Sequence, residues 1–202
     1  DCLLSRGLGD VYKRQVLTAV SLMAGLCGMA EPNADQKIKL EQNSTSTPAL
    51  GGKPLYDGYT LQWADDFNGS ELNRDDWNIE LHAPGWVNNE LQAYVDSPEN
   101  IYLENGSLVI KPIEQKNPDG TVSYTSGRVN TQNKHDFKYG IFEARIKVPE
   151  GQGFLPAFWM MPTNENLYGQ WPRCGEIDIM EVLGDDTDKS YGTIHYLSLI
   201  HI

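Results

Sequence analysis

The spacing of apolar residues restricts this chain to a β fold. No segment keeps an apolar period of about 3.6 residues over three helical turns, whereas apolar and charged side chains alternate along residues 142–148. Asn105-Gly106, a preferred pair for a two-residue hairpin turn, separates apolar runs at residues 101–103 and 108–110. Further short strands are expected at residues 59–63, 154–161, 176–182 and 191–196. The pattern predicts an all-β sandwich.

One of these expected strands combines apolar residues with three carboxylates. Glu176, Asp178 and Glu181 lie within six positions, and every position between them is apolar. Strict alternation puts Glu176 and Asp178 on one face of a strand but turns Glu181 to the other face. One extra residue in a β-bulge at Ile179-Met180 would bring Glu181 back beside the other two. A strand with acidic residues on its solvent face explains only the first two, so we expect a functional site.

Three carboxylates on one strand face suit glycoside hydrolysis with retention of configuration. Such enzymes hold two carboxyl groups about 5–5.5 Å apart, one as nucleophile and one as general acid and then base. Two glutamates at the ends of a bulged segment could converge to that separation. The aspartate between them would hold a proton or a hydrogen bond and push the two glutamate pKa values apart. The order therefore predicts Glu176 as nucleophile, Asp178 as helper and Glu181 as acid/base.

Several further motifs accompany the acidic strand. They are GWVNNELQAY at residues 85–94, SGR at 126–128, YGIFEAR at 139–145, PAFWMMP at 156–162, QWPRCG at 170–175 and GTIHY at 192–196. With these motifs the chain resembles family 16 of the glycoside hydrolases, specifically its bacterial laminarinase (endo-β-1,3-glucanase) branch. Order and spacing both match, from about residue 59 to residue 196.

The resemblance implies a β-jelly-roll sandwich, of the concanavalin A-like kind, whose concave face carries a glycan cleft. It implies the same roles for the three carboxylates. Trp159 and Trp171 would stack on sugar faces, and Asn89 and Arg128 would hydrogen-bond sugar hydroxyls near the cleavage point. His195 would lie on a neighbouring strand close to the acid/base. The extra residue in the acidic strand favours laminarinase-like activity over that of the family's lichenases.

The bulk properties exclude some partners. The net charge of −12 would repel nucleic acid phosphates, but it does not oppose a neutral polysaccharide such as β-1,3-glucan. We expect a monomer without a membrane span. No cofactor is expected, and His82, His135 and His195 lack metal-ligand spacing. Residues 65–69 could contribute to a structural calcium site, which many relatives in the family have. Cys174 is expected to be a small buried residue.

The N-terminal part resembles a secretion signal. Residues 16–30 form an apolar run that is too short to span a bilayer and long enough for the core of a signal peptide. A secreted or periplasmic protein is therefore expected. Cys27 raises the alternative of a cell-surface lipoprotein, but Leu26 stands where a small residue should precede a lipidated cysteine.

These observations divide the chain into five segments. Residues 1–15 and 197–202 share no pattern with the rest and are expected to be a non-native leader and tail. Residues 16–30 are the predicted signal peptide, and residues 31–53, rich in polar residues, are a predicted flexible linker. Residues 54–196 are the predicted catalytic domain, which we expect to be partial because sandwich domains often run to roughly 200–250 residues.

The leading hypothesis is a secreted, endo-acting, retaining hydrolase of β-1,3-glucan. Three alternatives remain open. The first is a hydrolase of another polysaccharide, such as mixed-linkage glucan, agar or carrageenan. The second is a transglycosylase that uses the same residues but passes the sugar to another sugar. The third is a non-catalytic glucan-binding module, although relatives of that kind have lost the catalytic glutamates.

Overall fold

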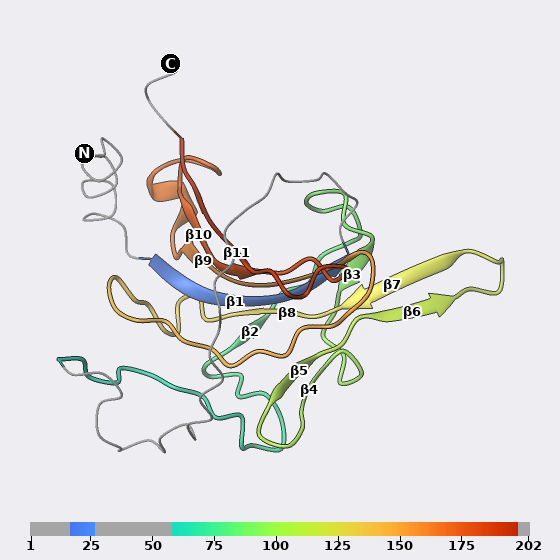
Figure 1. Cartoon of the computed structure of the whole chain (residues 1–202), viewed down its shortest axis with the longest axis horizontal. Coiled ribbons are helices and arrows are strands. Elements are labelled where there is room, and N and C mark those ends of the chain that lie inside the picture. The colour runs from blue at the N-terminus through green and yellow to red at the C-terminus, as the bar shows by residue number, and fades with distance from the viewer. Residues whose placement is uncertain (1–16, 27–57, 198–202) are drawn as a thin grey trace.

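The computed structural model describes the backbone of residues 17–26 and both the backbone and the side chains of residues 58–197. Three sheets and one short 3-10 helix make up this part of the chain (Figure 1). The strands are β1 (Leu17–Leu26), β2 (Asn78–Ile79), β3 (Gln92–Tyr94), β4 (Ile101–Leu103), β5 (Leu108–Ile110), β6 (Ile113–Lys116), β7 (Val122–Ser126), β8 (Arg128–Asn130), β9 (Phe154–Pro162), β10 (Glu176–Glu181) and β11 (Tyr191–His195). The 3-10 helix is η1 (Glu165–Leu167). The predicted all-β class is confirmed.

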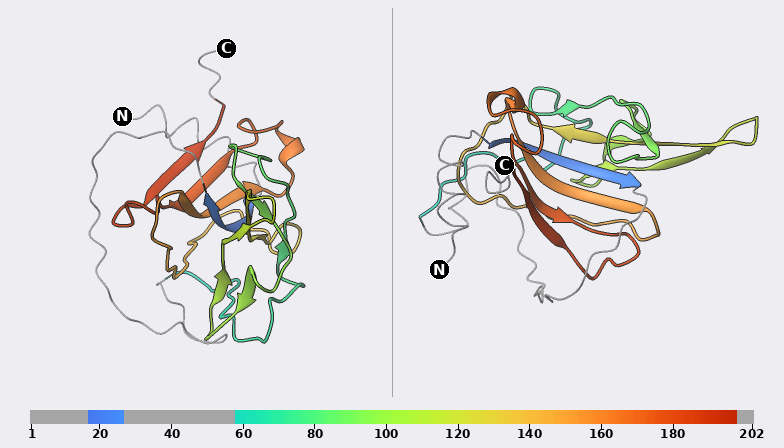
Figure 2. Two further views of the ribbon diagram at one scale, coloured as in Figure 1. Left: turned by 90° about the vertical axis from the view of Figure 1, so that its right-hand side faces the viewer. Right: turned by 90° about the horizontal axis from the view of Figure 1, so that it is seen from above.

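The largest sheet has six strands in the order β11-β10-β9-β1-β8-β2, with every neighbouring pair antiparallel. Figure 2 shows this sheet as a curved layer in which β1, β9, β10 and β11 follow one another. Its central strand β9 is almost continuously buried, as expected for an apolar run with neighbours on both sides. This strand anchors β10, which carries the three carboxylates.

The smaller sheets contain the turns that the sequence predicts. Asn105 and Gly106 join β4 to β5 with φ values of 52° and 69°, as a type I′ hairpin turn requires. The second small sheet, β3-β7-β6, includes a β6–β7 hairpin that extends away from the rest of the molecule (Figure 1). Both predicted strands of the 101–110 hairpin are thus confirmed.

The apolar core lies between the large sheet and the β4–β5 hairpin. Its buried members are Leu72, Trp77, Ile101, Val129 and Phe158. Leu72 and Trp77 come from the segment before β2, and the other three come from β4, β8 and β9, so the core packs one face of β9. The opposite face of β9 remains for the site.

Two predicted strands are absent from the structure. Residues 59–63 and 142–148 both lie outside any strand. The alternation in the second segment still has a packing effect, because Phe142 and Ile146 contact the core. The place beside β9 is occupied by β1, which pairs with it from Leu17 to Leu26. Alternation predicts which side chains face inward, but it does not predict which strands pair with each other.

The predicted segment boundaries fall mostly outside the described residues. Residues 1–15, 31–53 and 198–202 are among those not described. The core of the predicted signal peptide coincides with β1, and its removal in the mature protein stays a prediction. No helix in the described part of the chain is long and apolar enough to cross a bilayer.

Candidate active site

The bulge predicted in the acidic strand is present. Between β10 and β11, Asp178 lies opposite Thr193 and Glu181 lies opposite Tyr191, so three steps along one strand match two along the other. Between β10 and β9 the extra residue falls between Asp178 and Met180. The alternation of side chains between the two faces therefore shifts by one residue after Asp178, which is the effect of a β-bulge.

The register brings the three carboxylates to one face of the sheet. Glu176 is opposite His195, Asp178 is opposite Trp159, and Glu181 is opposite Ala157. Directly paired residues of neighbouring strands share a face, as do residues two apart on one strand. Met180, by contrast, pairs with the core residue Phe158 on the other face. Without the bulge, Glu181 would point toward that core.

Asp178 is buried between the other groups of the site. It is only 5 % exposed, and its Oδ2 atom lies 3.1 Å from Nε2 of His195. Burial and the neighbouring negative charge of Glu176 raise the pKa of Asp178 to about 6. The hydrogen bond between the two carboxyl groups raises the pKa of Asp178 and lowers that of Glu176. This hydrogen bond therefore favours the protonated form of Asp178 and the ionised form of Glu176.

Burial also raises the pKa of both glutamates. For Glu176, the charge of His195 and hydrogen bonds from Asp178 and Trp171 oppose this effect. For Glu181, the negative charge of Asp178 adds to burial, and only His195 opposes it. Of the two glutamates, only Glu176 has its pKa lowered by hydrogen bonds to its carboxylate. The two glutamates have different surroundings, which suits one for an ionised role and the other for holding a proton.

His195 contacts two of the carboxylates. Its Nε2 atom lies 3.7 Å from Oε1 of Glu176 and 3.1 Å from Oδ2 of Asp178. One potential ligand atom from each of these three residues lies within 4.8 Å of the others, which is close enough to hold a divalent cation. The spacing of histidines in the sequence could not indicate this set, because His195 and the carboxylates come from different strands.

The two predicted sugar-stacking tryptophans differ in exposure. Trp171 is 53 % exposed and its ring centroid lies 5.5 Å from that of His195. Trp159 is only 8 % exposed, and the guanidinium of Arg128 lies 4.6 Å from its ring centroid. The ring face that Arg128 covers is therefore not open to a sugar in this structure.

Asn89 lies apart from this group. It is exposed in the turn between Val87 and Glu90, with a left-handed φ of 53°. Among the described residues, no hydrogen bond or ion pair joins it to the other predicted site residues. Its predicted contact with sugar hydroxyls stays a prediction.

A polar network that the sequence did not indicate surrounds Arg128. The Arg128 Nε atom lies 2.8 Å from Oε2 of Glu80, and that oxygen also lies 2.9 Å from Nε2 of His82. The other carboxylate oxygen of Glu80 accepts a hydrogen bond from Asn130 at 2.6 Å. The ring of His82 stacks on Trp86 with centroids 3.5 Å apart. In the sequence, the only local sign of this network is that Glu80 and His82 lie two positions apart, just before the 85–94 motif.

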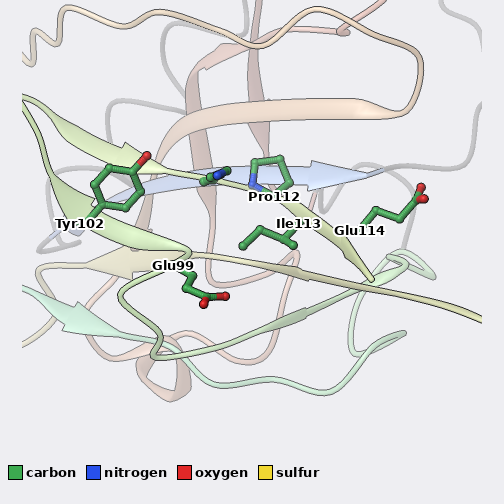
Figure 3. A pocket seen from close by; sticks show the side chains of 6 residues that line it. Glu99, Tyr102, Pro112, Ile113 and Glu114 are labelled. Carbon is green, nitrogen blue, oxygen red and sulfur yellow. The ribbon is translucent and has the colours of Figure 1, made fainter. Parts of the chain in front are cut away.

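Two surface hollows lie elsewhere. One of about 650 Å³ is lined by Glu99, Tyr102, Lys111, Pro112, Ile113 and Glu114 (Figure 3). Another of about 670 Å³ lies along residues 150–152 and 184–188. Neither contains a predicted catalytic residue. The candidate site is instead the open sheet face around β10.

Two other sequence predictions concern residues outside this face. Cys174 is fully buried, as predicted. The carboxylate of Asp65 accepts hydrogen bonds from Nε1 of Trp77 and from the backbone N–H of Phe67, both at 2.8 Å. Asp65 therefore braces the core, and the predicted calcium site at residues 65–69 stays a prediction.

A pair of carboxyl groups that flank the bond to be cleaved is the catalytic device of glycoside hydrolases, and this is the class of protein that the β fold and the carboxylates of β10 indicate. The sequence model of Glycosyl hydrolases family 16 matches residues 82–198. The chain is therefore a member of that family.

Individual relatives agree with this assignment. A glucan endo-1,3-beta-glucosidase of Cryptopygus antarcticus is 44% identical over 142 residues, which are 68% of this chain and 51% of the relative. Glucan endo-1,3-beta-glucosidase A1 of Niallia circulans is 37% identical over 183 residues, or 83% of this chain and 26% of the relative. The chain thus spans about half or less of the length of these relatives.

A solved structure is similar as well. The laminarinase from Rhodothermus marinus superimposes with a TM-score of 0.62 and 36% sequence identity. The match covers 70% of this chain and 57% of that structure. The fold predicted from the sequence, a β-jelly roll, is confirmed for the part of the domain that is matched.

Proposed function

We propose that this chain carries the catalytic face of a secreted, endo-acting, retaining hydrolase of β-1,3-glucan. The observation that carries the proposal is the bulge in β10, which gathers Glu176, Asp178 and Glu181 on one face beside His195. Family membership and the sequence similarity to two glucan endo-1,3-beta-glucosidases support the substrate class. The exposed ring of Trp171 supports a sugar-stacking site next to the nucleophile.

The reaction proceeds in two displacements. In the first, a carboxylate oxygen of Glu176 attacks the anomeric carbon while the glycosidic C–O bond breaks. Glu181 gives its proton to the departing oxygen, and a glycosyl ester forms on Glu176. In the second, Glu181 removes a proton from water as the water oxygen bonds to the anomeric carbon. The ester bond breaks and Glu176 returns to its ionised form.

The electrostatics described above support this division of roles. Hydrogen bonds from Asp178 and Trp171 favour the ionised form of Glu176, as a nucleophile requires. Burial favours the protonated form of Glu181, as a general acid requires, and Asp178 adds to this effect once it has lost its own proton. Asp178 acts as the helper, because in its protonated form it donates a hydrogen bond to the carboxylate of Glu176.

The test uses variants of the full-length protein. Glu176→Gln should abolish release of reducing sugar from laminarin while laminarin binding persists. Glu181→Gln should slow cleavage of laminarin but spare the first displacement on a substrate whose aryl leaving group needs no proton. Glu165→Gln, an exposed glutamate in η1, is the matched control and should retain the activity of the parent. Full activity in the Glu176→Gln variant would refute the assignment.

Substrate and reaction type are tested in the same assay. Laminarin, lichenan, agarose and carrageenan are compared side by side, and laminarin should be cleaved fastest. Release only from a galactan would keep the three carboxylates in their roles and change the substrate. Longer oligosaccharides among the products would indicate transglycosylation. Binding of laminarin without any release would favour a binding module.

A further inference from the structure

A largely buried carboxylate with no role in the proposed reaction, that of Glu80, pairs with Arg128. Glu80 follows β2, and its side chain is only 17 % exposed. Its backbone N–H donates to the carbonyl oxygen of Arg128 at 2.9 Å, which fixes the two segments side by side. Burial alone would raise the pKa of Glu80, yet Arg128, Asn130 and His82 together lower it. Glu80 therefore stays ionised and paired.

Both carboxylate oxygens of Glu80 are occupied. Oε2 faces Nε of Arg128 at 2.8 Å and Nε2 of His82 at 2.9 Å. Oε1 accepts from Nδ2 of Asn130 at 2.6 Å. A buried carboxylate that is fully paired in this way has its side chain locked, and it locks its partners in turn. Both Arg128 and His82 are held by the same oxygen.

Arg128 and His82 both contact the same exposed aromatic ring. The guanidinium carbon of Arg128 lies 5.1 Å from the ring centroid of Trp86 and 4.6 Å from that of Trp159. His82 stacks on Trp86 with an interplanar angle of 6°. Trp159 in turn pairs with Asp178 on the neighbouring strand. The contacts thus form a continuous path from Trp86 to the catalytic strand.

Trp86 is placed to contact a ligand. It is 47 % exposed, and its ring is held by the side chains of His82 and Arg128. An exposed indole that is held rigid stacks on a sugar with little loss of conformational entropy. Arg128 itself is only 7 % exposed, so its part is to hold the rings on either side of it.

We propose that Glu80 is a positioning residue that holds Arg128 and His82 in place and so fixes Trp86 as a sugar-contacting wall beside the catalytic strand. This inference rests on the proposed function, since it assigns a glycan contact to the same site. Glu80 acts on substrate affinity without touching the substrate. Its ion pair sets the distance between the Trp86 and Trp159 rings.

The experiment is a double-mutant cycle on the full-length protein with Glu80→Gln and Trp86→Ala. Glu80→Gln keeps the shape of the side chain but removes its charge. It should raise KM for laminarin oligosaccharides at least about tenfold, with kcat within about twofold of the parent. In the Trp86→Ala background the same change should have little further effect, because the ring that Glu80 positions is gone. Glu99→Gln, an exposed glutamate beside the hollow in Figure 3, is the matched control and should leave KM unchanged.

Binding is measured separately from turnover. Calorimetric titration of laminarin oligosaccharides into the Glu176→Gln protein should show the same loss of affinity when Glu80→Gln is added. If Glu80→Gln does not fold, Glu80→Asp keeps the charge and should give a smaller rise in KM. Unchanged affinity in the Glu80 variants, additive effects with Trp86→Ala, or a fall in kcat alone would each overturn the inference. Failure of the proposed function is recognised independently, because the parent protein would then release no reducing sugar from laminarin, whether or not it binds it.

Discussion

Asp178→Asn is expected to make the folded protein more stable at neutral pH, although it removes the helper of the proposed reaction. The folded-state pKa of Asp178 is raised from 3.8 to about 6, because burial and the charge of Glu176 oppose its ionisation. A carboxyl group with a raised folded-state pKa is harder to ionise in the folded state than in the unfolded state. The penalty is absent below the unfolded-state pKa, grows as the pH rises toward 6, and is complete above that value.

The size of the effect follows from the shift in pKa. Each pKa unit corresponds to about 1.4 kcal/mol, so a shift from 3.8 to about 6 amounts to an upper value of about 3 kcal/mol. Asn cannot ionise, and its amide can still donate to Glu176 and accept from His195. The variant should therefore have a free energy of unfolding up to about 3 kcal/mol higher than the parent at pH 7, and no gain near pH 3.5.

The assay is urea-induced unfolding of the full-length protein and its variant at pH 3.5, 5 and 7, followed by tryptophan fluorescence. Asp188→Asn, an exposed aspartate in the loop between β10 and β11, is the matched control and should give no comparable gain with pH. The reasoning is refuted if the difference between the Asp178→Asn variant and the parent does not grow from pH 3.5 to pH 7. A gain in stability together with a loss of activity would show that the cost of ionising Asp178 is a stability cost of the catalytic site.

Two further predictions concern packing and pH dependence. Gly127→Ala should destabilise the protein by about 1–3 kcal/mol in urea unfolding, since a Cβ there would lie 2.5 Å from Cγ1 of Ile101; an unchanged midpoint would contradict the close contact. His195→Gln should move the acid limb of the profile of kcat/KM against pH to higher pH, because the charge of His195 lowers the pKa of Glu176. An acid limb that stays in place or moves to lower pH would count against that interaction.

The acidic strand could be predicted from the sequence because its geometry is local. The side chains of a strand alternate, so the spacing of Glu176, Asp178 and Glu181 alone requires one extra residue if all three are to share a face. The hairpin at Asn105-Gly106 could be predicted for the same reason, because φ values above zero are a property of those two residues. Neither inference needs to know what lies on the next strand.

The polar wall around Glu80 could not be predicted in this way. Glu80, His82 and Trp86 lie close in the chain, but Arg128 comes from β8 and Trp159 from β9. Only the pairing of distant strands brings these groups within hydrogen-bonding and ring contact. The pKa of Glu80 likewise depends on its burial and on the charge of Arg128, which only the assembled sheets bring together.

The sequence by itself determined the β class, the turn in the 101–110 hairpin and the common face of the three carboxylates, since all of these follow from backbone periodicity and turn chemistry. Only the tertiary structure decided the order of strands in the large sheet, where β1 takes the place beside β9 and residues 142–148 form no strand. Strand order results from competition among all segments for the same backbone hydrogen bonds and the same core. That competition depends on the whole chain, whereas alternation is set within a few residues.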